Sequence, residues 1–109
     1  MTTGDILLAD LNPVTGQEQG GRRPVVVVSD PRYSAIPGLF LAVPLTSTHR
    51  RLPHHVVVPA NSTTGLDRIS YAMTEQIRTL AYRRIDRQLG SIDDNTVNEI
   101  SHYLHLFIS

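Results

Sequence analysis

Over its first two-thirds, the sequence consists of short apolar runs separated by turns rich in glycine, proline and asparagine. Runs of about four to eight residues are typical of β-strands, because helices are usually longer. One run, residues 25–29, carries β-branched side chains on both faces, which predicts a strand that is buried on two sides. The expected strands are residues 6–9, 25–29, 39–45, 54–59 and 69–78.

The last part of the chain changes to a helical pattern. Apolar residues recur there at the spacing of one helix face, at Val97, Ile100, Leu104, Phe107 and Ile108. Asp93 is the expected N-cap, and Asp94 would interact favourably with the positive end of the helix dipole. Short strands followed by one terminal helix predict a mainly β fold, a small and strongly curved antiparallel barrel with a C-terminal α-helix.

The chain has 109 residues, the usual size of one domain, so we expect a single domain over residues 1–109. It contains no cysteine, which excludes disulfide bonds and thiolate chemistry. The N-terminal segment has acidic residues and only a short apolar run, unlike a signal peptide or a membrane span. We therefore expect a cytoplasmic protein with no membrane partner.

Positive charge is concentrated in the middle of a chain whose net charge is zero. All ten cationic residues are arginines between Arg22 and Arg87, where four acidic residues leave a local charge of +6. Arginine suits bidentate contacts with phosphate. The pattern indicates an anionic partner, although a genome-wide preference for arginine codons would produce the same composition.

The glycine-rich segment GQEQGGRRP, residues 16–24, is the strongest candidate for a functional loop. Its glycines allow close approach of a bound chain, and Arg23 precedes a proline and a buried strand, which would hold its guanidinium on rigid scaffold. Glu18 is close enough in sequence to pair with it. Thr46 and Ser47 follow another strand, where hydroxyls can contact phosphate or complete a turn. The alternative interpretation of the loop is a solvated hairpin with charged tips.

The run 69–78 alternates between two faces. Gln76 and Arg78 are expected on one face, and Glu75 is expected on the other, beside Met73. A carboxylate among apolar neighbours lies at a sheet edge or is paired, and either would bear on its pKa.

The histidines predict no metal site. His54 and His55 are adjacent on an expected strand, so they should point to opposite faces and be unable to chelate one ion. Three helix residues share a face and are interpreted as a solvated or interface stripe: Glu99, His102 and His105. His49, beside Arg50, is a candidate for a substrate-binding loop or simply a basic loop tip. No cofactor is expected.

Three segments, in order and with similar spacing, resemble the MazF/PemK/Kid toxins. GDILLADLNPVTGQEQGGRRPVVVVS resembles the opening of that family, VPLTS its second signature, and EQIRTL followed by LGSIDDNTVNEI its third. The match runs from about Gly4 to the C-terminus. The resemblance implies an SH3-like barrel shared with the CcdB toxins, a homodimer, and neutralisation by a cognate antitoxin whose disordered tail folds onto the toxin.

The resemblance also implies an activity, the metal-independent and sequence-specific cleavage of single-stranded RNA to leave a 2′,3′-cyclic phosphate and a 5′-OH. By position, the catalytic residues would be Arg23, Thr46, Glu18 and Glu75. The RNA-binding residues would be Asn12, Gln17, Gln19, Ser47, His49, Arg50, Gln76 and Arg78. Some relatives carry an arginine where this chain has Met73. Arg23 would therefore have to supply more of the catalysis here, with either Glu18 or Glu75 as the general base.

Other functions fit the same fold. A toxin resembling CcdB would bind a topoisomerase without any enzymatic activity, although it would not need an arginine and a hydroxyl at one site. A plain RNA- or protein-binding barrel is a second alternative, and the scarcity of aromatic residues argues against its RNA-binding form. A relative that has lost activity is a third, because of Met73. The RNA sequence that is cut is not encoded in any recognisable motif.

Overall fold

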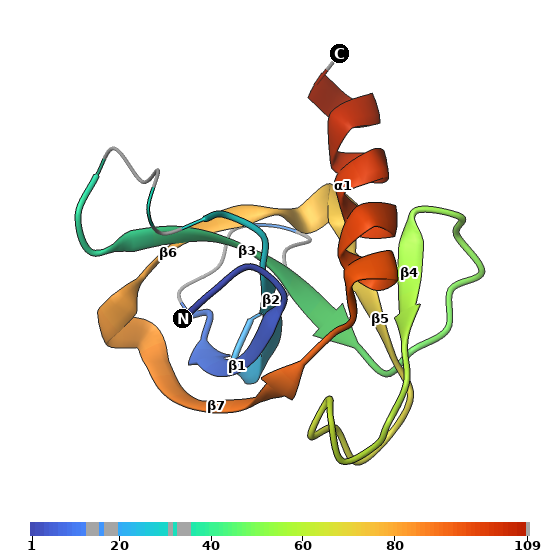
Figure 1. Ribbon diagram of the computed structural model, residues 1–109, viewed down its shortest axis with the longest axis horizontal. Coiled ribbons are helices and arrows are strands. Elements are labelled where there is room, and N and C mark those ends of the chain that lie inside the picture. The colour runs from blue at the N-terminus through green and yellow to red at the C-terminus, as the bar shows by residue number, and fades with distance from the viewer. Residues whose placement is uncertain (13–15, 17–19, 31, 33–35, 109) are drawn as a thin grey trace.

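The computed structural model describes residues 1–12, 16, 20–30, 32 and 36–108 (Figure 1). The strands are β1 (Asp5–Asp10), β2 (Arg22–Val27), β3 (Leu39–Thr46), β4 (His55–Val58), β5 (Ser70–Met73), β6 (Arg78–Ala81) and β7 (Ile85–Ser91). Two short 3₁₀ helices, η2 (Thr74–Gln76) and η3 (Tyr82–Arg84), lie between the late strands, and the chain ends in helix α1 (Asp94–Ile108). Among the described residues, no helix is long and apolar enough to cross a membrane.

The strands form one antiparallel sheet in the order β4-β5-β3-β2-β1-β7, with β6 pairing with the first half of β3. Ala42 of β3 pairs with Val27 of β2 and with Arg78 of β6, whereas Leu45 pairs with Ala72 of β5. The sheet therefore curves around β3, as Figure 1 shows. This confirms the expected barrel-like antiparallel fold with a C-terminal helix, and in the described strands the barrel stays open between β4 and β7.

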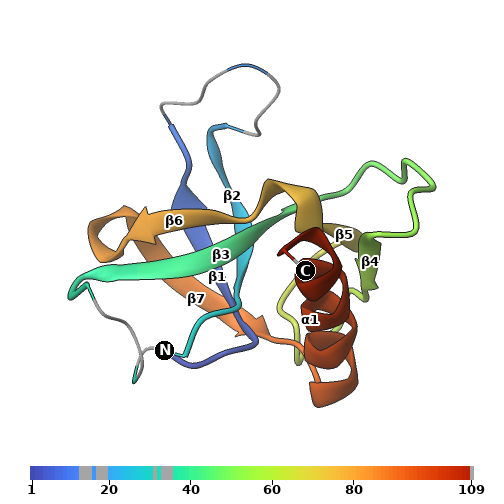
Figure 2. The ribbon, with the colours of Figure 1, turned by 90° about the horizontal axis from the view of Figure 1, so that it is seen from above.

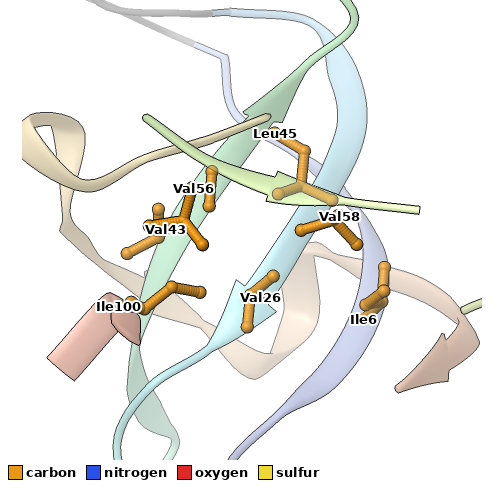
Figure 3. Close-up of a cluster of buried hydrophobic side chains, with 8 residues drawn as sticks. Ile6, Val26, Val43, Leu45, Val56, Val58 and Ile100 are labelled. Carbon is orange, nitrogen blue, oxygen red and sulfur yellow. The ribbon is translucent and has the colours of Figure 1, made fainter. Parts of the chain in front are cut away.

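The main core lies between the curved sheet and α1. Its fully buried side chains come from five strands and the helix: Ile6, Val26, Val43, Leu45, Val56, Val58, Ala72 and Ile100. Figure 3 shows most of these side chains converging, with Ile100 reaching in from α1. Apolar burial of this kind supplies the main driving force for folding.

A second cluster covers the other face of the central strands. It consists of Leu7, Ala9, Leu11, Val25, Val27, Phe40, Ala42 and Leu80. Val26 therefore faces one core while Val25 and Val27 face the other. This confirms the prediction that the β-branched run is buried on both sides.

The N-terminus of α1 is capped as expected. The Thr96 backbone N–H and hydroxyl both donate to Asp93 Oδ1, at 2.8 Å and 2.6 Å. These hydrogen bonds lower the pKa of the Asp93 carboxyl below its usual value. The other end of the helix is less buried, because Phe107 and Ile108 are 50% and 83% exposed. The apolar face of the helix is thus exposed to solvent at its C-terminal end.

The prediction of one strand over residues 69–78 is wrong. β5 ends at Met73, and the turn of η2 precedes β6. Thr74 is fully buried, and its hydroxyl donates to the His54 carbonyl at 2.6 Å. This contact holds the turn and interrupts the alternation, so Met73 enters the core while Glu75 is exposed.

The loop between β4 and β5 packs on β7 so closely that two positions require glycine. The Ser91 N–H donates to the Thr63 carbonyl at 2.9 Å. A Cβ at Gly65 would lie 1.9 Å from the Leu89 carbonyl oxygen, and one at Gly90 would lie 2.2 Å from the Thr63 oxygen. Gly65 also has a φ of +70°.

We expect Gly65→Ala to lower the free energy of unfolding by about 2–5 kcal/mol. About 1–2 kcal/mol comes from the left-handed backbone and about 1–3 kcal/mol from overpacking. Gly38→Ala is the matched control, because Gly38 has a φ of +82° and open space around its Cα, so only the first contribution applies. Urea denaturation measures both, and equal losses would contradict the close packing at Gly65.

Candidate functional site

Arg23 is held against the end of β3. Its side chain is partly buried at the start of β2, where Nε donates to the Gly20 carbonyl and Nη1 to the Leu45 carbonyl, both at 3.2 Å. Partial burial, and to a smaller extent the charge of Arg50, lower the pKa of the Arg23 guanidinium. The structure therefore fixes this guanidinium on rigid scaffold, as the sequence predicted.

Thr46 ends β3 directly after the carbonyl that Arg23 contacts. It is buried and pairs with Tyr71 of β5, and its Oγ1 accepts a hydrogen bond from the Thr48 N–H at 3.2 Å. Among the described residues, no acceptor is found for the hydrogen of the Thr46 hydroxyl. The hydroxyl hydrogen is thus available for a further hydrogen bond.

An open pocket of about 350 Å³ adjoins Arg23. It is lined by Arg23, Pro24, Leu45, Ser47, Leu66, Asp67, Arg68 and Ser70. The expected Ser47 is among these residues, whereas sequence analysis missed Asp67, Arg68 and Ser70. In the sequence they stand out only as a polar segment directly before a strand. A loop has no periodicity that would show where its side chains point.

The loop between β3 and β4 forms an aromatic stack with β5. The rings of His49 and Tyr71 lie 4.6 Å apart and are nearly parallel, at 5°. Such a pair offers a flat surface on which a base can stack. Sequence analysis proposed His49 but missed Tyr71. Figure 2 shows this loop extending away from the sheet beyond the end of β3.

Asn12 has a structural contact that the sequence did not indicate. Its Oδ1 accepts a hydrogen bond from the Gly21 N–H at 2.9 Å, and its carbonyl accepts one from Arg84. The side chain thus ties the end of β1 to the start of β2. Three predicted site residues lie outside the described residues: Gln17, Glu18 and Gln19.

Glu75, at η2, is bound by two histidines. His55 Nε2 lies 2.8 Å from Glu75 Oε1 and 3.1 Å from Oε2, and His54 Nε2 lies 3.5 Å from Oε1. The prediction that His54 and His55 point to opposite faces is therefore wrong. The reason is that β4 begins at His55, so His54 lies in the preceding turn and does not follow strand geometry.

Gln76 is the last residue of η2, and Arg78 is the first residue of β6. Gln76 Nε2 donates to the sulfur of Met73 at 3.7 Å, and Arg78 is partly buried opposite Ala42 of β3. Met73 is itself fully buried. In the described part of the chain, no hydrogen bond joins Glu75 to Arg23 or Thr46.

Comparison with known proteins identifies one family. The family model described as the PemK-like, MazF-like toxin of type II toxin-antitoxin systems matches residues 2–108. The endoribonuclease EndoA of Bacillus subtilis (strain 168) is 33% identical over 109 residues, covering 97% of this chain and 92% of that protein. The endoribonuclease MazF of Staphylococcus saprophyticus is 33% identical over 108 residues, covering 97% of this chain and 89% of that protein.

Solved structures show the same fold. The crystal structure of MazF (Form-I) from Deinococcus radiodurans aligns with a TM-score of 0.85 and 29% identity, over 99% of this chain and 96% of that chain. A MazE-MazF structure (Form-II) from the same organism aligns with a TM-score of 0.78 and 29% identity, over 99% and 95% of the two chains.

We expect Asn12→Ala to lower the free energy of unfolding by about 1 kcal/mol, because the Gly21 N–H loses its acceptor. Asn12→Asp keeps an oxygen at that position and is the matched control, which should lose less. Thermal unfolding measures both variants. Unchanged stability of Asn12→Ala together with weaker RNA binding would instead support the predicted role of Asn12 as an RNA contact.

Proposed function

Because the chain belongs to the PemK-like, MazF-like toxin family, we propose that it is an endoribonuclease that cleaves single-stranded RNA at specific sequences without a metal ion. The observation that carries this proposal is the Arg23 guanidinium, which is fixed beside Thr46 and opens onto a pocket. The curated relatives named as endoribonucleases support the activity.

The reaction requires three events at one phosphodiester. A carboxylate takes the proton of the neighbouring 2′-hydroxyl, the 2′-oxygen attacks phosphorus, and the 5′-oxygen leaves with a proton from a general acid. The products are a 2′,3′-cyclic phosphate and a 5′-OH. Each proton has a donor and an acceptor among side chains of the types present here, so the chemistry does not depend on a bound metal.

Arg23 and Thr46 would act on the phosphate. The guanidinium stabilises the negative charge that grows on the phosphorane oxygens, and the Thr46 hydroxyl donates to one of them. Because the pKa of Arg23 is lowered by burial and by Arg50, this side chain is also a better proton donor to the leaving 5′-oxygen than a solvated arginine. Ser47, Arg68 and the His49–Tyr71 stack would bind the flanking nucleotides.

The general base is one of two carboxylates, Glu18 or Glu75. The Glu75 side chain is 36% exposed and oriented by His55, so it is accessible to a bound strand. Glu18 belongs to the loop next to Arg23 in sequence. Replacing each by glutamine and comparing the pH dependence of cleavage assigns the base, because only loss of the base abolishes the rise of rate with pH.

A homodimer and a cognate antitoxin complete the proposal. The MazE-MazF structure from Deinococcus radiodurans, which this chain matches over almost its full length, supports an antitoxin partner. The exposed apolar end of α1, formed by Leu106, Phe107 and Ile108, supports self-association, because such a patch gains free energy when it is covered.

We expect the purified protein to cut a long single-stranded RNA in EDTA at discrete positions with cyclic phosphate ends. Arg23→Ala should slow this cleavage at least about 100-fold, because it removes the charge that stabilises the phosphorane. The rate is measured on a labelled RNA, and circular dichroism checks the fold of the variant.

Arg87→Ala is the matched control, because Arg87 is an exposed arginine of β7 that pairs with Asp86. It should cleave at the wild-type rate. Intact RNA across varied sequences would contradict the proposal and favour the non-enzymatic toxin that binds a topoisomerase. Cleavage that stops in EDTA would contradict the metal-independent mechanism.

We expect the protein in solution to have twice the mass of one 12.1 kDa chain. Association would cover the apolar end of α1. Light scattering coupled to size exclusion measures this mass at micromolar concentration, and a monomer there would contradict the homodimer.

A further inference from the structure

We propose that His54, His55 and Glu75 form a binding site for a divalent transition-metal ion of the zinc class. Each residue offers one ligand atom, and these atoms all lie within 4.8 Å of one another. Among the described residues, no other group of three histidine or acidic side chains gathers in this way. The helix residues Glu99, His102 and His105, which share a face, do not.

The donor set and its spacing suit zinc. Two imidazole nitrogens and one carboxylate oxygen are a common set for Zn²⁺ sites that keep a fourth position open. Tetrahedral ligands at about 2.0–2.1 Å from the metal lie roughly 3.3 Å from one another. The distances from Glu75 Oε1 to the two Nε2 atoms, 2.8 Å and 3.5 Å, lie on either side of that value. Magnesium and calcium prefer all-oxygen sets and should not compete.

The backbone already holds the three residues together. The Thr74 hydroxyl donates to the His54 carbonyl at 2.6 Å, and His55 pairs with Met73 across β4 and β5. These contacts fix the turn that carries the histidines against the turn that carries Glu75. The ring of Phe107 from α1 meets the His54 ring edge-on at 5.7 Å, which limits the orientations of that imidazole. An ion would then need side-chain adjustments only, which close a ligand set spread over as much as 4.8 Å to roughly 3.3 Å.

The site is accessible from solvent on one side. The His55 side chain is only 1% exposed, whereas those of His54 and Glu75 are 27% and 36% exposed. An ion can therefore enter past His54 and Glu75 and keep a water molecule in the open position. In the described structure His55 Nδ1 is buried without a hydrogen-bond partner. A hydrogen-bond partner on the second nitrogen of a metal-bound histidine typically improves metal affinity about 10–100-fold. Because His55 lacks this partner, we expect weaker, reversible binding that EDTA removes.

Metal binding would have a consequence for activity, which rests on the proposed function. Glu75 is one of the two candidate general bases, and coordination would occupy the oxygen that accepts a proton or contacts RNA. Zinc would then inhibit cleavage, whereas the metal-free protein remains the active form.

The binding test uses isothermal titration of the purified, chelator-treated protein with Zn²⁺. We expect one site per chain in the wild type and at least 10-fold weaker binding in His54→Gln, which changes a partly exposed residue outside the core. His102→Gln is the matched control, because it replaces an exposed histidine on α1 and should leave the affinity unchanged. No zinc binding by the wild type, or equal binding by wild type and His54→Gln, would overturn the site.

The inhibition test adds Zn²⁺ to the RNA cleavage assay. Each protein's rate is expressed relative to its own rate without zinc, and on that scale His54→Gln should resist a zinc concentration that inhibits the wild type. Inhibition of both proteins to the same extent would overturn the link between this site and activity. The titration needs no RNA cleavage, so failure of the proposed nuclease function and failure of the metal site give different results.

Discussion

Every part of the candidate site depends on β3, because this strand is hydrogen-bonded along both of its edges. On one edge it pairs with β2, and on the other with β6 and then β5. Because β2 and β3 run antiparallel, with Val25 opposite Pro44, the start of β2 lies next to the end of β3. Arg23 can then donate to the Leu45 carbonyl beside Thr46.

The features that sequence analysis predicted correctly are those that neighbouring residues decide. The two-sided burial of residues 25–27 follows from β-branched residues in succession, and the Asp93 cap follows from an acidic residue directly before an apolar helical pattern. The positions of Arg23 and Thr46 at strand ends were also predicted, because local sequence defines each strand, and their functional roles stay predictions. In the structure, Arg23 donates to the carbonyl of Leu45, the residue before Thr46.

The features that sequence analysis missed depend on contacts between distant segments. The alternation of residues 69–78 gave no sign that Thr74 would bond to the His54 carbonyl and end the strand. The same contact places His54 in a turn, so that both histidines reach Glu75 and strand geometry does not separate them. Asn12 was expected only as an RNA-binding residue, and its hydrogen bond from the Gly21 N–H again joins two separate segments. A single hydrogen bond between distant segments can change the local structure that a sequence pattern predicts.

The arginines of this neutral chain differ in whether a carboxylate offsets their charge. Arg22 pairs with Asp86, and Arg32 pairs with Asp30, so carboxylates offset the charges of both side chains. Arg23 is oriented by carbonyl oxygens, which hold the guanidinium without neutralising it. A preference for arginine codons would explain the number of arginines but not this arrangement. A guanidinium that carbonyl oxygens hold at a pocket, with no ion pair to a carboxylate among the described residues, favours a phosphate at that position over general attraction of polyanions.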